Sequence, residues 1–237
     1  MYKRQFPTSH AATISPPYLL HLPGIAGRLW IDDAVTRGLK EGGIGGTIEV
    51  YNWAGIDRGL PALGFVKRHR EQARIVADKL IAHVRQHPGS KITLISHSAG
   101  CGIAIYALEQ LPDDVGIDAL LMMHSALSPE YDLSNALRHV TRAYSFHSSH
   151  DMVLDWGTRA FGTLDRRFST AAGRVSYSCP AAGDNAQYAK LTQFDYDRKW
   201  LKLGNRGDHI GPMDRKFGRE MLAPLLLTGK LPDVSDR

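Results

Sequence analysis

Residues 91–100 read KITLISHSAG, and residues 101–110 continue as CGIAIYALEQ. The first six residues are rich in β-branched and aliphatic side chains, a composition typical of a strand. The run from Ala99 onward is small and apolar and predicts a buried helix. A strand therefore passes directly into a helix through one tight turn, and Ser98 is the central residue of that turn.

A turn this tight imposes strained backbone angles on its central residue and requires small neighbours. Ser96 and Gly100, two positions before and after Ser98, meet that requirement. The turn lifts the Ser98 hydroxyl above the predicted sheet and directs the helix N-terminus at it, where free N–H groups stabilise a developing oxyanion. Ser96 is a poor alternative nucleophile, because the bulky Leu94 stands two positions before it. Ser98 is the candidate nucleophile.

Strand-like and helix-like segments alternate along the rest of the chain. We expect strands at residues 18–22, 47–51, 91–96, 117–124, 143–147 and 191–196. We expect helices at residues 32–39, 69–86, 99–110, 133–140 and 214–227, the last bent or ended by Pro224. We expect a loop at residues 52–65. The pattern of residues 152–187 does not assign them clearly to a helix or a strand. Alternation of this kind predicts a mostly parallel sheet with helices on both faces. With no repeat or linker in the sequence, residues 1–237 are expected to form a single domain.

The SHSAG turn between a strand and a helix resembles the G-x-S-x-G elbow of the α/β-hydrolase family, with Ser96 in place of the first glycine. The resemblance implies the α/β-hydrolase fold and a serine esterase-like or lipase-like activity. The short segment between the fourth and fifth expected strands leaves little or no room for a cap domain.

The family order of serine, acid and histidine implies the two partners of the nucleophile. Asp151 follows the expected strand at residues 143–147 through a short loop and is the candidate acid; Asp155 and Asp165 lie further from a strand end. His209 is the candidate base, because it lies in the glycine-rich stretch GNRGDHIGPM just before the C-terminal helix.

The resemblance also implies an oxyanion hole made of two backbone amides. One is the amide of Ala99; the other is assigned to Ile25, in the loop HLPGIAG (residues 21–27) that ends the first expected strand. Candidate substrate contacts are Gly24, Trp53, His97, Met152 and Val153. Residues 152–187 are either a lid or a pocket wall.

The implied reaction is acyl transfer from a small-molecule carboxylic ester through an acyl-enzyme intermediate. A thioesterase, amidase or lipase of the same fold remains an alternative, as does a non-catalytic binding protein with a hydrolase fold.

The composition limits which binding partners are expected. The formal net charge is +5 and the pI about 9.2, but basic residues are scattered rather than gathered in a stripe, so no nucleic-acid partner is expected. Neither a membrane-length apolar run nor a secretory leader is evident, which favours a cytoplasmic protein without a membrane span. The sequence makes no prediction of the oligomeric state.

No cofactor or metal is expected. His83 and His87 are four residues apart but lack the glutamate of an H-E-x-x-H site, and His147 and His150 beside Asp151 lack a third histidine. The glycine-rich residues 42–46 precede an expected strand instead of opening a helix, so they do not form a phosphate loop.

Overall fold

A computed structural model describes residues 15–55 and 65–234 of the chain. Within these residues, six strands form one parallel sheet in the order β2-β1-β3-β4-β5-β6. The strands are β1 (Tyr18–Leu22), β2 (Thr47–Val50), β3 (Ile92–His97), β4 (Ile117–Met123), β5 (Val140–His147) and β6 (Leu191–Asp195). Each expected strand is confirmed, with small shifts at the ends. The expected mostly parallel central sheet is also confirmed.

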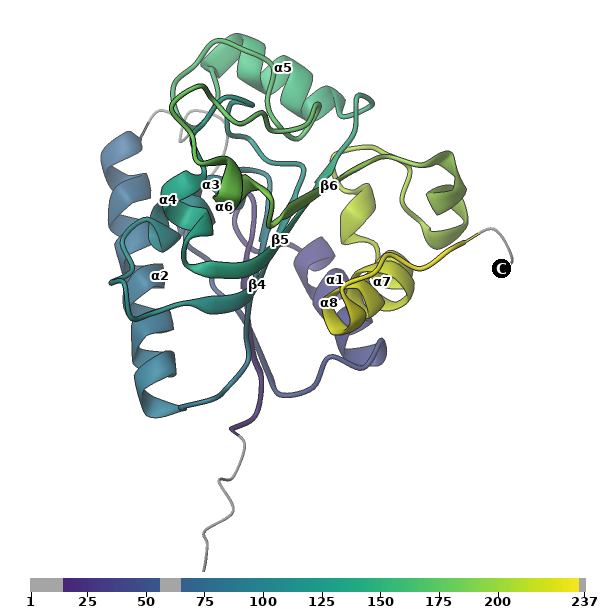
Figure 1. The fold of residues 1–237 in the computed structure, drawn as a ribbon. Helices are drawn as coiled ribbons and strands as arrows, with labels where there is room; N and C mark the ends of the chain where they lie inside the picture. Colours follow the sequence, from purple (N-terminus) through teal and green to yellow (C-terminus); the bar gives the residue numbers. More distant parts are fainter. Residues whose placement is uncertain (1–14, 56–64, 235–237) are drawn as a thin grey trace, which may run out of the picture.

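Helices cover both faces of the sheet (Figure 1). On one face lie α2 (Val66–Gln86), α3 (Ala99–Leu108) and α4 (Ser134–Leu137). On the other lie α1 (Trp30–Glu41), α7 (Arg215–Phe217) and α8 (Ala223–Thr228). Parallel neighbours require crossover connections, and helices in those connections give this three-layer arrangement.

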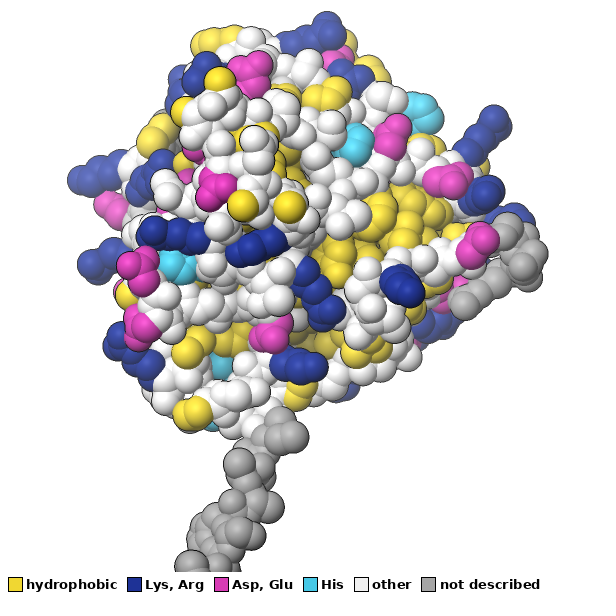
Figure 2. Space-filling view, viewed as in Figure 1, with side chains coloured by type: hydrophobic (Ala, Val, Ile, Leu, Met, Phe, Trp, Pro, Cys, Tyr) yellow, Lys and Arg dark blue, Asp and Glu magenta, His cyan; other side chains and the backbone are white. Residues whose placement is uncertain are grey.

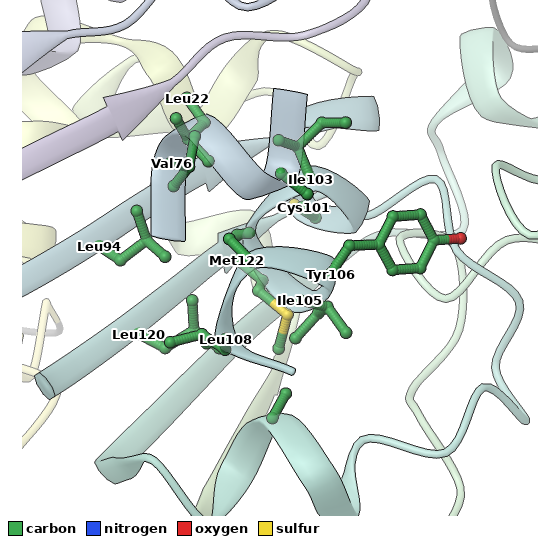
Figure 3. Packing of buried hydrophobic residues seen from close by; sticks show 14 of the residues in the cluster. Leu22, Val76, Leu94, Cys101, Ile103, Ile105, Tyr106, Leu108, Leu120 and Met122 are labelled. Carbon is green, nitrogen blue, oxygen red and sulfur yellow. The ribbon is translucent and has the colours of Figure 1, made fainter. Parts of the chain in front are cut away.

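Two hydrophobic clusters fill the space on either side of the sheet. Along β1, Leu20 and Leu22 belong to the cluster under α2 and α3, whereas Leu19 belongs to the cluster under α1, because successive side chains of a strand point to opposite faces. Figure 3 shows the first cluster, in which side chains of α3 meet those of the sheet. Every residue of α3 is buried, as expected for a helix that is apolar on all sides.

The expected helix at residues 133–140 is too long. Helix α4 ends at Leu137, and β5 begins at Val140, which pairs with Ile117 of β4. The β-branched Val140 and Thr141 fit a pleated strand better than a helix end. Pairing with β4 places them in β5.

Pro224 does not end the C-terminal helix. Helical backbone runs from α7 through a π-helical turn, η4 (Gly218–Leu222), into α8, which places Pro224 in its first turn. Inside a continuous helix a proline removes one intrahelical hydrogen bond and crowds the preceding turn, and the π-helical turn directly before Pro224 accommodates it. The widened turn of η4 replaces the expected break at Pro224.

Residues 152–187 contain two short helices, α5 (Met152–Phe161) and α6 (Asn185–Tyr188). Helix α5 lies beyond the sheet, at the top of Figure 1. The loop between α5 and α6 is tied to the segment after β4 by backbone hydrogen bonds, including Leu164 N to Ala126 O and Gly173 N to Ser125 O. This part of the chain is therefore fixed to the carboxyl-terminal side of the sheet.

Charged side chains of both signs are interspersed on the face seen in Figure 2. Among the described helices, none combines the length and the apolar character needed to cross a membrane. Of the loop expected at residues 52–65, residues 56–64 lie outside the described part of the chain.

Candidate active site

Ser98 occupies the turn between β3 and α3 with φ 54° and ψ −122°. Few residues with a side chain adopt a positive φ, and such strain persists only where the surroundings fix it. Here the Ser98 amide donates to Met123 O at 2.9 Å, while the Ser98 carbonyl accepts from the amides of Cys101 and Ala126. Hydrogen bonds to both its amide and its carbonyl thus hold the strained backbone of Ser98 in place.

The small neighbours of Ser98 have separate structural reasons. A Cβ added to Gly100 would lie 2.4 Å from the carbonyl oxygens of both Leu22 and Pro23, so α3 approaches the end of β1 too closely for any side chain. Ser96 fits where the family pattern has glycine, because its buried hydroxyl donates to Leu121 O of the adjacent strand at 3.2 Å.

The loop after β1 passes directly over the nucleophile position. A Cβ added to Gly24 would lie 3.3 Å from Ser98 Cβ and 3.8 Å from Ser98 Oγ. Among the described residues, the Ile25 and Ala99 amides donate no backbone hydrogen bond, and the first amides of any helix lack an intrahelical partner. Neither amide is thus committed to a backbone acceptor, as a donor to an oxyanion must not be.

Trp53 lies behind this loop rather than in front of it. The side chain is 2% exposed, and its Nε1 donates to Pro23 O at 2.7 Å. The structure thus places Trp53 as a support of the loop that carries Gly24 and Ile25, and not on a pocket wall.

Asp151 is completely buried and forms the N-cap of α5. Its Oδ1 accepts from the Leu154 amide at 2.9 Å, and its Oδ2 accepts from Nδ1 of His209 at 2.6 Å and Nδ1 of His124 at 2.8 Å. Burial alone would raise the pKa of the Asp151 carboxyl, but the two histidine hydrogen bonds outweigh burial and hold that pKa well below its usual range. The carboxylate is therefore ionised.

The alternative acids have other partners. Asp155 forms an ion pair with Arg174, and Asp165 accepts hydrogen bonds from the amide and hydroxyl of Ser128. Neither pairing brings a histidine to the carboxylate.

His209 lies in the loop just before the short 3₁₀ helix η3 (Gly211–Met213). Nδ1 of His209 donates to Asp151, so its second ring nitrogen, Nε2, is left for another partner. The backbone carbonyl of His209 accepts from Nε2 of His97 at 2.8 Å. Burial, and then the neighbouring His209, keep the pKa of His97 well below its ordinary value, so His97 is a neutral donor.

Ser98 and His209 line one pocket of about 150 Å³. Among the described residues no hydrogen bond joins Ser98 Oγ to His209, although such contacts often tighten only when substrate binds. The remaining lining includes Gly24, His97, Asp32 and mainly apolar residues: Ile25, Ala26, Gly27, Leu29, Ile31, Val153 and Ile210. Met152 is 55% exposed and outside this lining.

His124, Asp151 and His209 also form a set of groups that could hold a metal ion. Each histidine nitrogen, however, is only 2.6–2.8 Å from the same carboxylate oxygen. A cation bound about 2.0–2.2 Å from each atom in a tetrahedral site would require wider separations. The observed distances are those of hydrogen bonds from the two histidines to Asp151.

His124 is the residue of this site that sequence reasoning missed. It directly follows β4, whose carboxyl end meets those of β3 and β5 at one edge of the sheet. Polar residues at such strand ends usually line the sites of parallel sheets. That rule could have identified His124 from the sequence.

No protein-family model matches the sequence, and no curated protein matches it either. Solved structures with a similar fold do exist. Lipase B from Aspergillus fumigatus superposes with a TM-score of 0.55 at 12% identity, over 98% of this chain and 57% of that one. An acetylxylan esterase gives a TM-score of 0.50 at 15% identity, over 93% of this chain and 100% of that one. This chain thus spans little more than half the length of the lipase. The shared architecture is the α/β-hydrolase fold.

Proposed function

We propose that this protein is a serine hydrolase that cleaves carboxylic esters through an acyl-enzyme intermediate on Ser98. The observation that carries the proposal is the 2.6 Å pairing of His209 Nδ1 with the buried carboxylate of Asp151, beside the pocket that Ser98 lines. Because Nδ1 is committed to the carboxylate, Nε2 is the nitrogen that can take the serine proton.

In the proposed acylation step, His209 Nε2 takes the hydroxyl proton while Ser98 Oγ attacks the ester carbonyl carbon. The carbonyl electron pair moves to oxygen, which accepts hydrogen bonds from the amides of Ile25 and Ala99. Asp151 stabilises the imidazolium formed on His209. The carbon–oxygen bond then breaks, and the alcohol leaves with the proton that His209 returns.

In the proposed deacylation step, His209 takes a proton from water, and the resulting hydroxide oxygen attacks the acyl carbonyl carbon. The second tetrahedral oxyanion uses the same two amides. Ser98 Oγ leaves with the proton from His209, and the carboxylic acid is released. Each turnover consumes one ester and one water and requires no oxidant or other co-reactant.

The size of the pocket supports a short acyl group. An apolar cavity of about 150 Å³ accommodates a molecule the size of benzene, and the pocket beside Ser98 has a volume of about 150 Å³ with mostly apolar lining. We therefore propose acyl groups of up to about six carbon atoms. The similarly folded structures are named as a lipase and an acetylxylan esterase, which agrees with an ester as the substrate class.

The strained backbone of Ser98 favours catalysis over mere binding. Residues held at sparsely populated backbone angles cluster at active sites, where strain is part of the mechanism. A binding protein would have no need for a serine at φ 54° beside a histidine–carboxylate pair.

Hydrolysis of p-nitrophenyl butyrate by the wild type and by Ser98→Ala tests this function. We expect the substitution to lower kcat by at least about 10³-fold. Ser169→Ala, at an exposed serine outside the lining of the Ser98 pocket, should leave kcat unchanged. Equal turnover by wild type and Ser98→Ala would reject the mechanism.

A fluorophosphonate probe should label Ser98, as located by peptide mass spectrometry; a non-catalytic binding protein would not be labelled there. A thioester and an anilide with the same butyryl group complete the panel. Preference for either over the oxygen ester would replace the proposed substrate class while keeping the triad.

A further inference from the structure

Asp151 is held by two histidines, but the proposed reaction uses only one of them. His209 and His124 both donate through Nδ1 to the same carboxylate oxygen, at 2.6 and 2.8 Å. The second oxygen of Asp151 accepts from the Leu154 amide. His124 is therefore a second donor to the oxygen that His209 uses, with no part in the steps written above.

The conformation of His124 is held from several directions. Its φ is 50°, in the left-handed region that few residues with side chains enter. Its amide donates to Phe146 O at 3.0 Å, and its ring is 2% exposed. A Cβ added to Gly173 would lie 2.3 Å from the His124 carbonyl carbon, so the loop after α5 packs directly on it. Surroundings that enforce an unfavourable backbone are common at functional sites.

We propose that His124 is a positioning residue, whose Nδ1–H fixes the Asp151 carboxylate in the orientation that His209 requires. The inference rests on the proposed function of Ser98, His209 and Asp151. Three donors, two on Oδ2 and one on Oδ1, define the carboxylate plane. With His124 removed, one donor on each oxygen remains, and the carboxylate gains freedom to rotate or shift away from His209.

The electrostatic surroundings agree with a neutral donor. Burial lowers the pKa of His124, against the opposing effect of its hydrogen bond to Asp151. His209 and Asp208 also act on His124, while His97 and His147 are the other titratable groups that interact with it. In its neutral form His124 donates to Asp151 without placing a second positive charge beside His209.

Two substitutions separate hydrogen-bond donation from folding. His124→Gly removes the donor and adopts the left-handed backbone freely. His124→Asn keeps an N–H donor, and asparagine also tolerates this conformation. We expect His124→Gly to lower kcat for p-nitrophenyl butyrate about 10- to 100-fold, the range for losing one hydrogen bond to a charged group. KM should change little, and His124→Asn should recover most of the lost kcat.

The pH profile is a readout that a merely structural role would not move. Without His124, the carboxylate is free to shift away from His209 and stabilises its protonated form less, so the acid limb of kcat/KM should move to lower pH by about 0.5–1 unit. His139→Asn is the matched control, since His139 is also buried and also uses Nδ1, bonding to Val115 O at 2.8 Å away from the pocket lining. Its kcat and acid limb should equal those of the wild type.

Nuclear magnetic resonance of ¹⁵N-histidine-labelled protein follows the His209 titration directly and needs no substrate. A midpoint that falls in His124→Gly and returns in His124→Asn supports the positioning role even if p-nitrophenyl butyrate is not hydrolysed, in which case the proposed function alone fails. If hydrolysis depends on Ser98 but kcat, acid limb and titration are the same in His124→Gly as in the wild type, the positioning role is rejected. Equal losses in the Gly and Asn variants would also reject it, because donation would not be the property that matters.

Discussion

Nε2 of His97 lies 2.8 Å from the backbone carbonyl oxygen of His209 and joins two residues that are 112 positions apart in the chain. The two imidazole rings are also close, with centroids 4.7 Å apart. His97 directly precedes Ser98, so this hydrogen bond ties the elbow to the loop of the candidate base. A residue expected to contact substrate thereby also fixes the distance between nucleophile and base.

Replacement of His97 should therefore impair catalysis through the position of His209. His97→Leu removes the donor and leaves the His209 carbonyl without it, and we expect kcat to fall about 10-fold, the effect of one lost hydrogen bond. His97→Gln, which keeps a donor, should lose less. Steady-state kinetics with p-nitrophenyl butyrate measures both, and a rise in KM alone would instead assign His97 to substrate binding.

Gly24 should be intolerant of even one added carbon. Its Cβ would lie 3.3 Å from Ser98 Cβ, tighter than most contacts of a Cβ atom, with His97 Nδ1 also at 3.4 Å. Gly24→Ala would displace the loop that carries the Ile25 amide, and loss of one oxyanion donor typically lowers kcat about 10²–10³-fold. Gly45→Ala is the control, because a Cβ there meets nothing within 4 Å. Similar kcat values in the two variants would argue against this loop as part of the oxyanion hole.

Gly100→Ala should lower the stability of the protein more directly than it lowers catalysis. The new Cβ would lie 2.4 Å from two carbonyl oxygens, and backbone cannot yield as a flexible side chain can. We expect the free energy of unfolding to fall by about 3 kcal/mol, the upper range for overpacking a core. Urea denaturation measures this fall. A loss as small as that of Gly45→Ala would contradict the close packing of α3 against β1.

Stability should decrease as the pH falls from about 7 toward 5. Burial lowers the pKa values of His97 and His124 in the folded protein from the ordinary value of 6.5. Below that value the unfolded chain binds protons that the folded protein does not, so acid favours unfolding by roughly 1 kcal/mol per pH unit for each such histidine. Urea midpoints across this pH range test the trend. His97→Gln should flatten it, and an unchanged slope would show that His97 does not stay neutral.

Val153 should tune the acyl chain length. It lines the pocket beside Ser98 but is 53% exposed, so changes there should have little effect on folding. Val153→Ala widens the pocket and should move the best p-nitrophenyl ester toward longer chains, by about two carbons at the volume of a methylene group each. Val153→Phe should restrict turnover to acetate and propionate. An identical chain-length profile in all three proteins would place the acyl group elsewhere.

Local sequence determined much of the fold because its signals act over short stretches. The β-branched run before Ser98 and the small residues after it specify a strand, a turn and a helix without reference to the rest of the chain. Expectations failed where a distant partner decided the outcome. Val140 joins a strand because Ile117 pairs with it, and Pro224 is accommodated because a π-helical turn shifts the helix before it.

By itself, the sequence determined the α/β class, the strained turn at Ser98, and the order in which a candidate acid and base follow it. Only the tertiary structure decided that His124 and His209 meet at one oxygen of Asp151, that His97 holds the His209 backbone, and that Trp53 supports the loop from behind. The reason is physical. A tight turn limits its own residues through local sterics, whereas hydrogen bonds between side chains from different strand ends depend on how the whole sheet brings those ends together.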